Sequence, residues 1–204
     1  MSNTEDASKA SRHLKITQPS PWVARWAQLI KTHGSVLDLA AGGGRHGRLF
    51  LERGHPVTFV DRTVEPLQDL TNHQNAELIE ADLEDGSPWP LGARRFDAVV
   101  VVNYLHRELF AQLIASLNPG GVLIYETFAR GNEDFTRPRN PDHLLKSGEL
   151  LDAMSVKLQV VAYEHGLVKN ADITGVKQRL CAVNDLGVST REDGEPKAHE
   201  ISRV

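Results

Sequence analysis

Residues 36–47 read VLDLAAGGGRHG, and this stretch decides the fold. An apolar strand, 36–39, runs into small residues, and a helix is expected to begin directly after them. Small residues let the backbone approach a ligand closely. A helix start offers free N–H groups and a partial positive charge that suit a carboxylate or phosphate. Consecutive glycines reduce helix stability, which favours a ligand-binding loop over a plain turn.

Short aliphatic runs lie on both sides of this loop and alternate with segments of helical periodicity. The runs are continuous rather than alternating, which suits strands buried on both faces of a sheet. This alternation predicts the α/β class, with a three-layer, doubly wound, Rossmann-like sheet that is mostly parallel. The expected strands are 36–39, 57–60, 78–79, 98–102 and 122–125.

Helical spacing places apolar side chains on one face of two segments. Before the first strand these are Trp22, Trp26, Leu29 and Ile30. After the fourth strand they are Leu105, Leu109, Leu113 and Leu117. The sequence Asn118-Pro119-Gly120-Gly121 is expected to end that second helix and turn into the fifth strand.

The C-terminal third has a different pattern. Residues 156–164 and 176–183 are expected to be two strands joined by a loop without a helix between them. Such a pair predicts an antiparallel hairpin at the sheet edge. A dinucleotide-binding fold built throughout from strand–helix units would not contain it.

Composition indicates one globular domain. The chain has 204 residues, of which 40% are hydrophobic and 25% charged. The net charge of -4 argues against binding that depends on phosphate neutralisation. The single cysteine, Cys181, allows no disulfide within the chain and favours a reducing cytoplasm. We expect a flexible arm over 1–18, a domain over 19–185 and a flexible tail over 186–204, with no signal peptide or membrane span.

The glycine loop has two interpretations. Gly42, Gly44 and Gly47 spell G-x-G-x-x-G, the dinucleotide pattern, with Asp61 downstream. The same loop fits an acid-x-small-x-Gly-x-Gly pattern that begins at Asp38 inside the strand. Dinucleotide binding needs no carboxylate there, whereas the cationic amino group of a methionine moiety could use one.

Two further acids follow the next two strands. Asp61 ends the second strand, where a carboxylate can accept both ribose hydroxyl protons. Asp82 follows the third strand, where a carboxylate can accept from an adenine amine while the Leu83 backbone N–H faces a ring nitrogen. Either acid alone could be an ordinary capping or loop residue. Three acids at successive strand ends favour an adenosine-containing ligand.

At this point the chain resembles the class I S-adenosylmethionine-dependent methyltransferases. The resemblance rests on VLDLAAGGGRHG, VTFVDR, IEADLED, FDAVVVVNYLHR and LNPGGVLIYETF, within about residues 20–128. The segments GGGRH, GHPVTFVD, KSGELL and YEHG make it similar to the small tellurite-resistance type. The resemblance implies seven strands with the last antiparallel, and S-adenosylmethionine as cofactor.

The resemblance also implies a role for each matched residue. Asn103 would border the sulfonium and the acceptor, and Arg62 would join Asp61 at the ribose. Ala40 departs from the family, where many members have glycine. The residues implied at the methionine end are Asp38, Ala40, Ala41, Gly42 and Gly44.

Acceptor residues are expected after the fourth and fifth strands, because open α/β sheets bind ligands at that edge. Tyr104 and His106 are candidates to orient or deprotonate an acceptor. Their alternatives are a packed tyrosine and a capping histidine. Arg130, Arg137 and Arg139 lie close together after the fifth strand and suggest an anionic acceptor, although a solvated loop is the alternative. Arg107, after the fourth strand, is a further candidate to bind the acceptor.

Other functions stay open from the sequence alone. The scattered histidines show no metal-ligand spacing, so no metal is predicted. The alternatives to a small-molecule methyltransferase are an RNA methyltransferase, a non-catalytic S-adenosylmethionine-binding protein and an NAD(P)-dependent oxidoreductase. The sequence does not define an oligomeric state.

Overall fold

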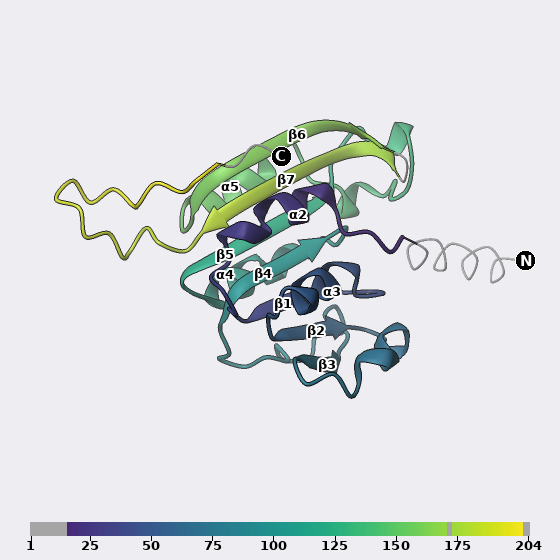
Figure 1. Cartoon of the computed structure of the whole chain (residues 1–204). Helices are drawn as coiled ribbons and strands as arrows, with labels where there is room; N and C mark the ends of the chain where they lie inside the picture. The colour runs from purple at the N-terminus through teal and green to yellow at the C-terminus, as the bar shows by residue number, and fades with distance from the viewer. Residues whose placement is uncertain (1–15, 171–172, 202–204) are drawn as a thin grey trace, which may run out of the picture.

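A seven-stranded sheet in the order β3-β2-β1-β4-β5-β7-β6 forms the centre of the molecule (Figure 1). The computed structural model describes residues 16–170 and 173–201. Five strands pair in parallel: β1 (Val36–Leu39), β2 (Val57–Asp61), β3 (Ala76–Glu80), β4 (Phe96–Val102) and β5 (Leu117–Phe128). β7 (Thr174–Val183) is antiparallel to both β5 and the edge strand β6 (Gln159–Lys169). The predicted fold class is confirmed.

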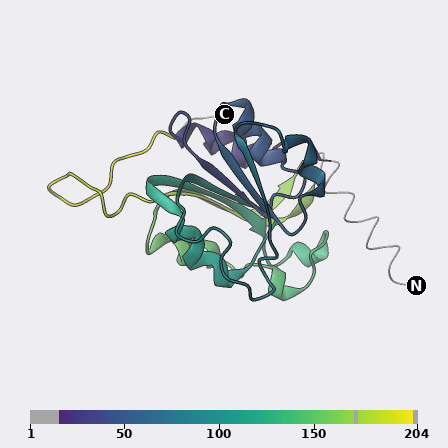
Figure 2. The same cartoon turned by 90° about the horizontal axis from the view of Figure 1, so that it is seen from below.

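Helices cover both faces of the sheet, as Figure 2 shows edge-on. α2 (Pro21–Trp26) and α3 (Arg45–Glu52) lie on one face, and α4 (Phe110–Ala115) and α5 (Glu149–Ser155) on the other. Apolar side chains therefore form two cores, one on each side of the strands. Short 3-10 helices complete the layers: η1 (Ala27–Leu29), η2 (Glu65–Leu70), η3 (Arg107–Leu109), η4 (Asn132–Asp134) and η5 (Pro141–His143).

The helix after β4 is shorter than predicted. α4 ends at Ala115, and Leu117 is already the first residue of β5, opposite Phe96. The predicted helix over Leu105–Leu117 with its terminating turn at 118–121 is therefore wrong at both ends, because Leu105 lies outside any helix and the 3-10 helix η3 precedes α4. Leu117 is fully buried, so its apolar character suits a strand as well as a helix.

Two further boundaries differ from prediction. Val156 is 74% exposed and belongs to the end of α5, because backbone N–H groups of Lys157 and Leu158 still bond to the Met154 carbonyl. The strand predicted from Val156 thus begins at Gln159. Residues 81–95 between β3 and β4 contain no helix. Prolines and glycines in this segment (Pro88, Pro90, Gly86 and Gly92) account for the turns.

The ends of the chain are only partly described. Most of the predicted N-terminal arm, residues 1–15, lies outside the described residues. Residues 186–201 form neither helix nor strand, and His199 lies 2.7 Å from the Asp185 carboxylate. The mobility of both ends stays a prediction. Within 16–170 and 173–201, no helix has the length and apolar character needed to cross a bilayer.

Candidate functional site

Loops that follow β1, β2, β3 and β4 meet at the carboxyl edge of the sheet and enclose a first cavity. Its volume is about 440 Å³, within the usual range of small-ligand sites. Three acidic side chains contribute to its wall, so we call it the acidic cavity. Its lining residues are Ala40, Asp61, Arg62, Ala81, Asp82, Leu83, Glu84 and Tyr104.

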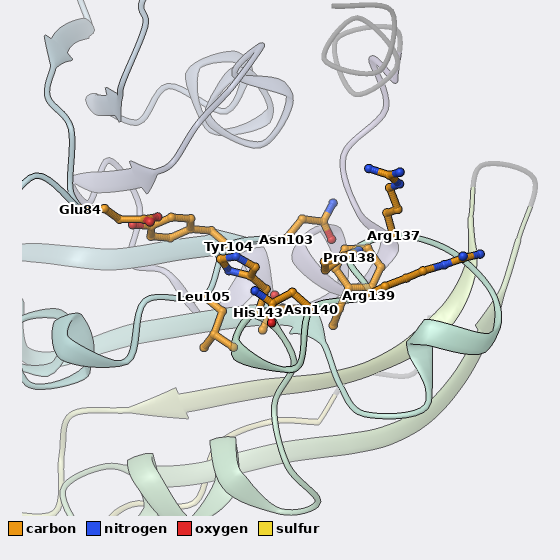
Figure 3. A pocket seen from close by; sticks show the side chains of 11 residues that line it. Glu84, Asn103, Tyr104, Leu105, Arg137, Pro138, Arg139, Asn140 and His143 are labelled. Atoms are coloured by element: carbon orange, nitrogen blue, oxygen red, sulfur yellow. The ribbon is translucent and has the colours of Figure 1, made fainter. Parts of the chain in front are cut away.

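A second cavity, of about 560 Å³, adjoins the first. Glu84 and Tyr104 line both cavities. Figure 3 shows these two side chains at one end of the second cavity and Arg137 and Arg139 at the other, and we call it the arginine cavity. Its lining residues are Glu84, Asn103, Tyr104, Leu105, Thr127, Phe128, Arg137, Pro138, Arg139, Asn140 and His143.

The glycine loop turns sharply between β1 and α3. Gly42 and Gly44 have φ values of 55° and 70°, the left-handed region that glycine adopts without strain. A Cβ on Gly44 would lie 2.5 Å from Leu67 Cδ2, so this glycine packs against the protein. A Cβ on Gly42 would meet no atom within 4 Å. Gly42 therefore faces open space, where a ligand could contact the backbone directly.

Asp38 lies beneath this loop rather than in either cavity wall. Its carboxylate is buried and accepts a hydrogen bond of 2.8 Å from the Gly47 backbone N–H, in the first turn of α3. Burial raises the pKa of Asp38 to about 7, partly offset by the Gly47 hydrogen bond and reinforced by Asp61. Asp38 thus fixes the loop and places negative charge under it, at an electrostatic cost to the fold.

The other two predicted acids line the acidic cavity. Asp61 accepts from the Gly42 N–H at 2.7 Å and from the Thr63 N–H at 3.1 Å, so it joins the end of β2 to the glycine loop. Asp82 accepts from the Glu84 N–H at 2.9 Å through one oxygen. A carboxylate offers about four lone-pair positions, so both acids can accept further hydrogen bonds. Leu83 lines the same cavity, as do Ala40 and Arg62.

Tyr104 lies at the junction of the two cavities. Its hydroxyl is buried and makes no hydrogen bond of acceptable geometry within the described residues. Burial raises the pKa of Tyr104 well above its usual value, followed by the charge and close approach of the Glu84 carboxylate and then by the charges of Asp82 and Asp61. The phenol therefore keeps its proton at neutral pH and can serve as a hydrogen-bond donor but not as a general base.

Asn103 directly follows β4 and lines the arginine cavity. Its φ of 59° is left-handed, a conformation that asparagine tolerates better than most residues. Its side-chain oxygen accepts a hydrogen bond of 2.8 Å from Lys177 Nζ. Lys177 in turn forms a buried ion pair with Glu126. Lys177 was not predicted from the sequence, and its signal is a cation within the otherwise uncharged segment 174–178.

The predicted acceptor residues separate into two groups. Arg137 and Arg139 are exposed at the rim of the arginine cavity, and no ion pair holds either one among the described residues. Arg107 is not in its wall: the guanidinium pairs with Glu149 at 2.5 Å and donates to two backbone carbonyls. His106 is also absent from both cavity walls and lies 4.0 Å from Glu108.

Several lining residues were not predicted. Glu84, Leu105, Thr127, Phe128, Pro138, Asn140 and His143 complete the arginine cavity. Pro138, Asn140 and His143 reach the cavity because the segment 129–145 folds back so that Ala129 and Leu145 pair, a contact that no local pattern encodes. Among the residues that the structure describes, no group of three or more His, Cys, Asp or Glu side chains is arranged to hold a metal ion.

Comparisons of sequence and of structure show which known proteins this chain resembles. Residues 36–121 match the family model of a methyltransferase domain. A curated relative, the malonyl-[acyl-carrier protein] O-methyltransferase of Salmonella typhimurium, is 30% identical over 132 residues. That match covers 62% of this chain and 51% of the relative, so the chain spans about half the relative's length.

Solved structures show the same fold. TehB from Haemophilus influenzae superposes with a TM-score of 0.64 at 19% identity, covering 80% of this chain and 61% of TehB. The 1,6-didemethyltoxoflavin-N1-methyltransferase of Burkholderia thailandensis, solved with S-adenosylhomocysteine, superposes with a TM-score of 0.64 at 19% identity. This match covers 89% of this chain and 83% of the methyltransferase. The resemblance seen in the sequence is confirmed. Residues 36–121 thus resemble a methyltransferase domain, and the chain shares its fold with solved methyltransferases.

Proposed function

We propose that the chain transfers a methyl group from S-adenosylmethionine to a small anionic acceptor. The observation that carries this proposal is the pair of adjoining cavities, one beside the glycine loop and lined with acids, the other bordered by exposed arginines. Tyr104 and Glu84 belong to both walls, so ligands bound in the two cavities would meet there. A shared boundary is what direct transfer between two bound molecules requires.

The acidic cavity fits the donor. Gly42 leaves open space beside its backbone, as a ligand approaching the loop needs. Asp61 and Asp82 retain acceptor capacity for the ribose hydroxyls and the adenine amine, and the Leu83 backbone can face the ring. The ionised form of Asp38 would place negative charge beneath the loop, where a cationic methionine end would favour it. Ala40, Ala41, Gly44 and Arg62 complete the proposed donor site.

The arginine cavity fits an acceptor that carries a carboxylate or phosphate. Arg137 and Arg139 both end in guanidinium groups that match such anions bidentately. Two relatives named above act on small or carrier-bound molecules, by O-methylation in one case and N1-methylation in the other. Those reactions support a small-molecule acceptor over RNA, as does the net charge of -4.

The residues of the site would contribute alignment rather than proton transfer. When bound, the donor supplies a methyl group already activated on a positively charged sulfur. Tyr104, which stays protonated, can donate a hydrogen bond and orient the acceptor. Leu105 and Phe128 line the same cavity with apolar surface, which helps to exclude water. His106 lies outside the wall and would act only through a neighbouring residue.

A transfer assay tests the proposal. Purified protein is incubated with methyl-labelled S-adenosylmethionine and an extract separated into anionic, neutral and RNA fractions. We expect labelled product in the anionic small-molecule fraction. Arg137→Ala/Arg139→Ala should raise the KM for that acceptor about tenfold or more, while Arg95→Ala, an exposed arginine far from the cavity, serves as the control. Label confined to RNA and lost on ribonuclease treatment would contradict the proposal.

A further inference from the structure

A buried charged cluster lies behind Asn103, on the face of the sheet that α2 and α3 cover. Lys177 of β7 and Glu126 of β5 are both 3% exposed in their side chains and form an ion pair. Arg179 approaches the second Glu126 oxygen at 3.2 Å, and the Ser20 hydroxyl donates to it at 2.7 Å. The carboxylate therefore has three partners, and Lys177 has Glu126, Asn103 and the Phe128 ring.

Stability alone does not explain this arrangement. Removing two charges from water costs several kcal/mol per ion, and a buried pair often stabilises no better than apolar residues of similar volume. Burial alone would raise the pKa of Glu126, yet Lys177 and Arg179 hold it below its usual range, so the carboxylate stays charged. A charged pair buried at this position is better explained by the hydrogen bond that Lys177 donates to Asn103.

Lys177 contacts the side chain that borders the cavity. Its ammonium has three donors and no acceptor, so the Asn103 atom 2.8 Å away must be the amide oxygen. The backbone of Asn103 is also fixed, because its N–H donates to the Glu126 carbonyl at 2.8 Å. Because the oxygen faces Lys177, the NH₂ group lies at the other end of the amide, and it donates to no partner among the described residues. Figure 3 shows Asn103 between the Tyr104 and Arg137 ends of the arginine cavity.

We propose that Lys177 is a positioning residue that holds the Asn103 amide by its oxygen and presents the NH₂ group to the arginine cavity. The acceptor must then offer a lone pair at that point, such as a carboxylate oxygen or an unprotonated ring nitrogen. An ammonium group facing Asn103 has no lone pair, so it would place its own N–H donors against the NH₂ group and be rejected. This inference rests on the proposed function, because it defines the acceptor of that same site.

Nuclear magnetic resonance of the full chain tests the orientation without any acceptor. With ¹⁵N-labelled asparagine side chains, the Asn103 NH₂ resonances are assigned by their loss in Asn103→Ser. We expect two resolved protons with no strong nuclear Overhauser effect to the Lys177 side chain. A strong effect between the Asn103 NH₂ protons and Lys177 would overturn the proposal. This measurement uses the unaltered protein and so does not depend on a variant that folds.

Variants then test whether Lys177 sets the orientation. Lys177→Met should move the Asn103 NH₂ resonances towards those of a freely rotating amide, whereas Lys177→Arg should largely restore them. Lys157→Met, at an exposed lysine, should leave them unchanged. Asn103 resonances that stay in place in folded Lys177→Met would also overturn the proposal.

Kinetics separate this inference from the proposed function. Lys177→Met should lower kcat up to about 100-fold through misalignment, while S-adenosylhomocysteine affinity changes less than about threefold. A chain that binds no S-adenosylmethionine would contradict the proposed function but leave the resonance test of Asn103 intact. Normal kcat in Lys177→Met would contradict the positioning role alone.

Discussion

The backbone N–H of Gly42 donates to the Asp61 carboxylate across 2.7 Å, which joins the loop after β1 to the end of β2. The two residues lie 19 positions apart in the chain, and Asp61 lines the acidic cavity. The contact sets the loop geometry before any ligand arrives. A site formed in advance loses less free energy on ordering when it binds.

Alanine at the two loop glycines should destabilise the fold to different extents. Gly42→Ala places a methyl group in open space, so only left-handed strain of about 1–2 kcal/mol should appear in the free energy of unfolding. Gly44→Ala adds a clash with Leu67 and should destabilise by about 2–5 kcal/mol. Denaturant unfolding measures both values.

Donor binding by the folded Gly42→Ala variant gives the second half of this test. The new methyl group would occupy the space proposed for the donor, so calorimetry should show S-adenosylmethionine affinity reduced at least about tenfold. Unchanged affinity would show that the donor does not approach Gly42.

Asp38→Asn should stabilise the protein at neutral pH. The folded pKa of Asp38 is about 7, above its unfolded value of 3.8, so the folded state holds the proton more tightly. Wild-type stability from this group is therefore greatest at low pH and is lost as pH rises from about 4 to 7. The stability gain of Asp38→Asn should grow over that window, reaching up to roughly 4 kcal/mol.

Thermal unfolding of both proteins across pH 4–8 measures this difference. Asp97→Asn is a control of opposite sign, because hydrogen bonds from Lys31, Asn118 and Ser35 overcome burial and lower the pKa of Asp97. That variant should be less stable than wild type at neutral pH, with the gap closing on acidification. A constant difference between Asp38→Asn and wild type would refute the raised pKa of Asp38.

Tyr104→Phe tests orientation against base catalysis. Among the described residues the buried hydroxyl makes no hydrogen bond of good geometry and lies beside the Glu84 carboxylate, so its removal should change stability by no more than about 1 kcal/mol. A lost hydrogen bond to the acceptor should lower kcat/KM about tenfold without altering the shape of the pH–rate profile. A loss of about 100-fold or more together with a vanished basic limb would instead assign Tyr104 as the base.

The sequence predicted the parallel strands, the terminal hairpin and the residues at successive strand ends. These features depend on local apolar runs and on the loop after β1, and Asp61 and Asp82 follow directly from strand ends that share one edge. Asp38 was expected near the ligand, and the structure shows it buried under the loop, where it accepts from the Gly47 N–H. The sequence does not indicate which side chain an N–H group of α3 will contact.

Residues that depend on long-range folding could not be predicted in the same way. Lys177 reaches Asn103 across 74 positions, and only the insertion of β7 beside β5 brings them together. Arg107 looked like an acceptor residue by its place after β4. The structure shows it tying the segment around Asp142 and Leu144 to Glu149 instead.

Calorimetric titration of Asp61→Asn with S-adenosylmethionine tests the central claim most directly. The asparagine can still accept from Gly42 but offers less acceptor capacity to the ribose and no charge. The affinity of Asp61→Asn for S-adenosylmethionine should fall at least about tenfold. Asp69 is an exposed acid paired with Arg48, so Asp69→Asn should bind S-adenosylmethionine with wild-type affinity. Equal affinity in Asp61→Asn and wild type, or preference of wild type for NAD over S-adenosylmethionine, would contradict the assignment of the acidic cavity to the methyl donor.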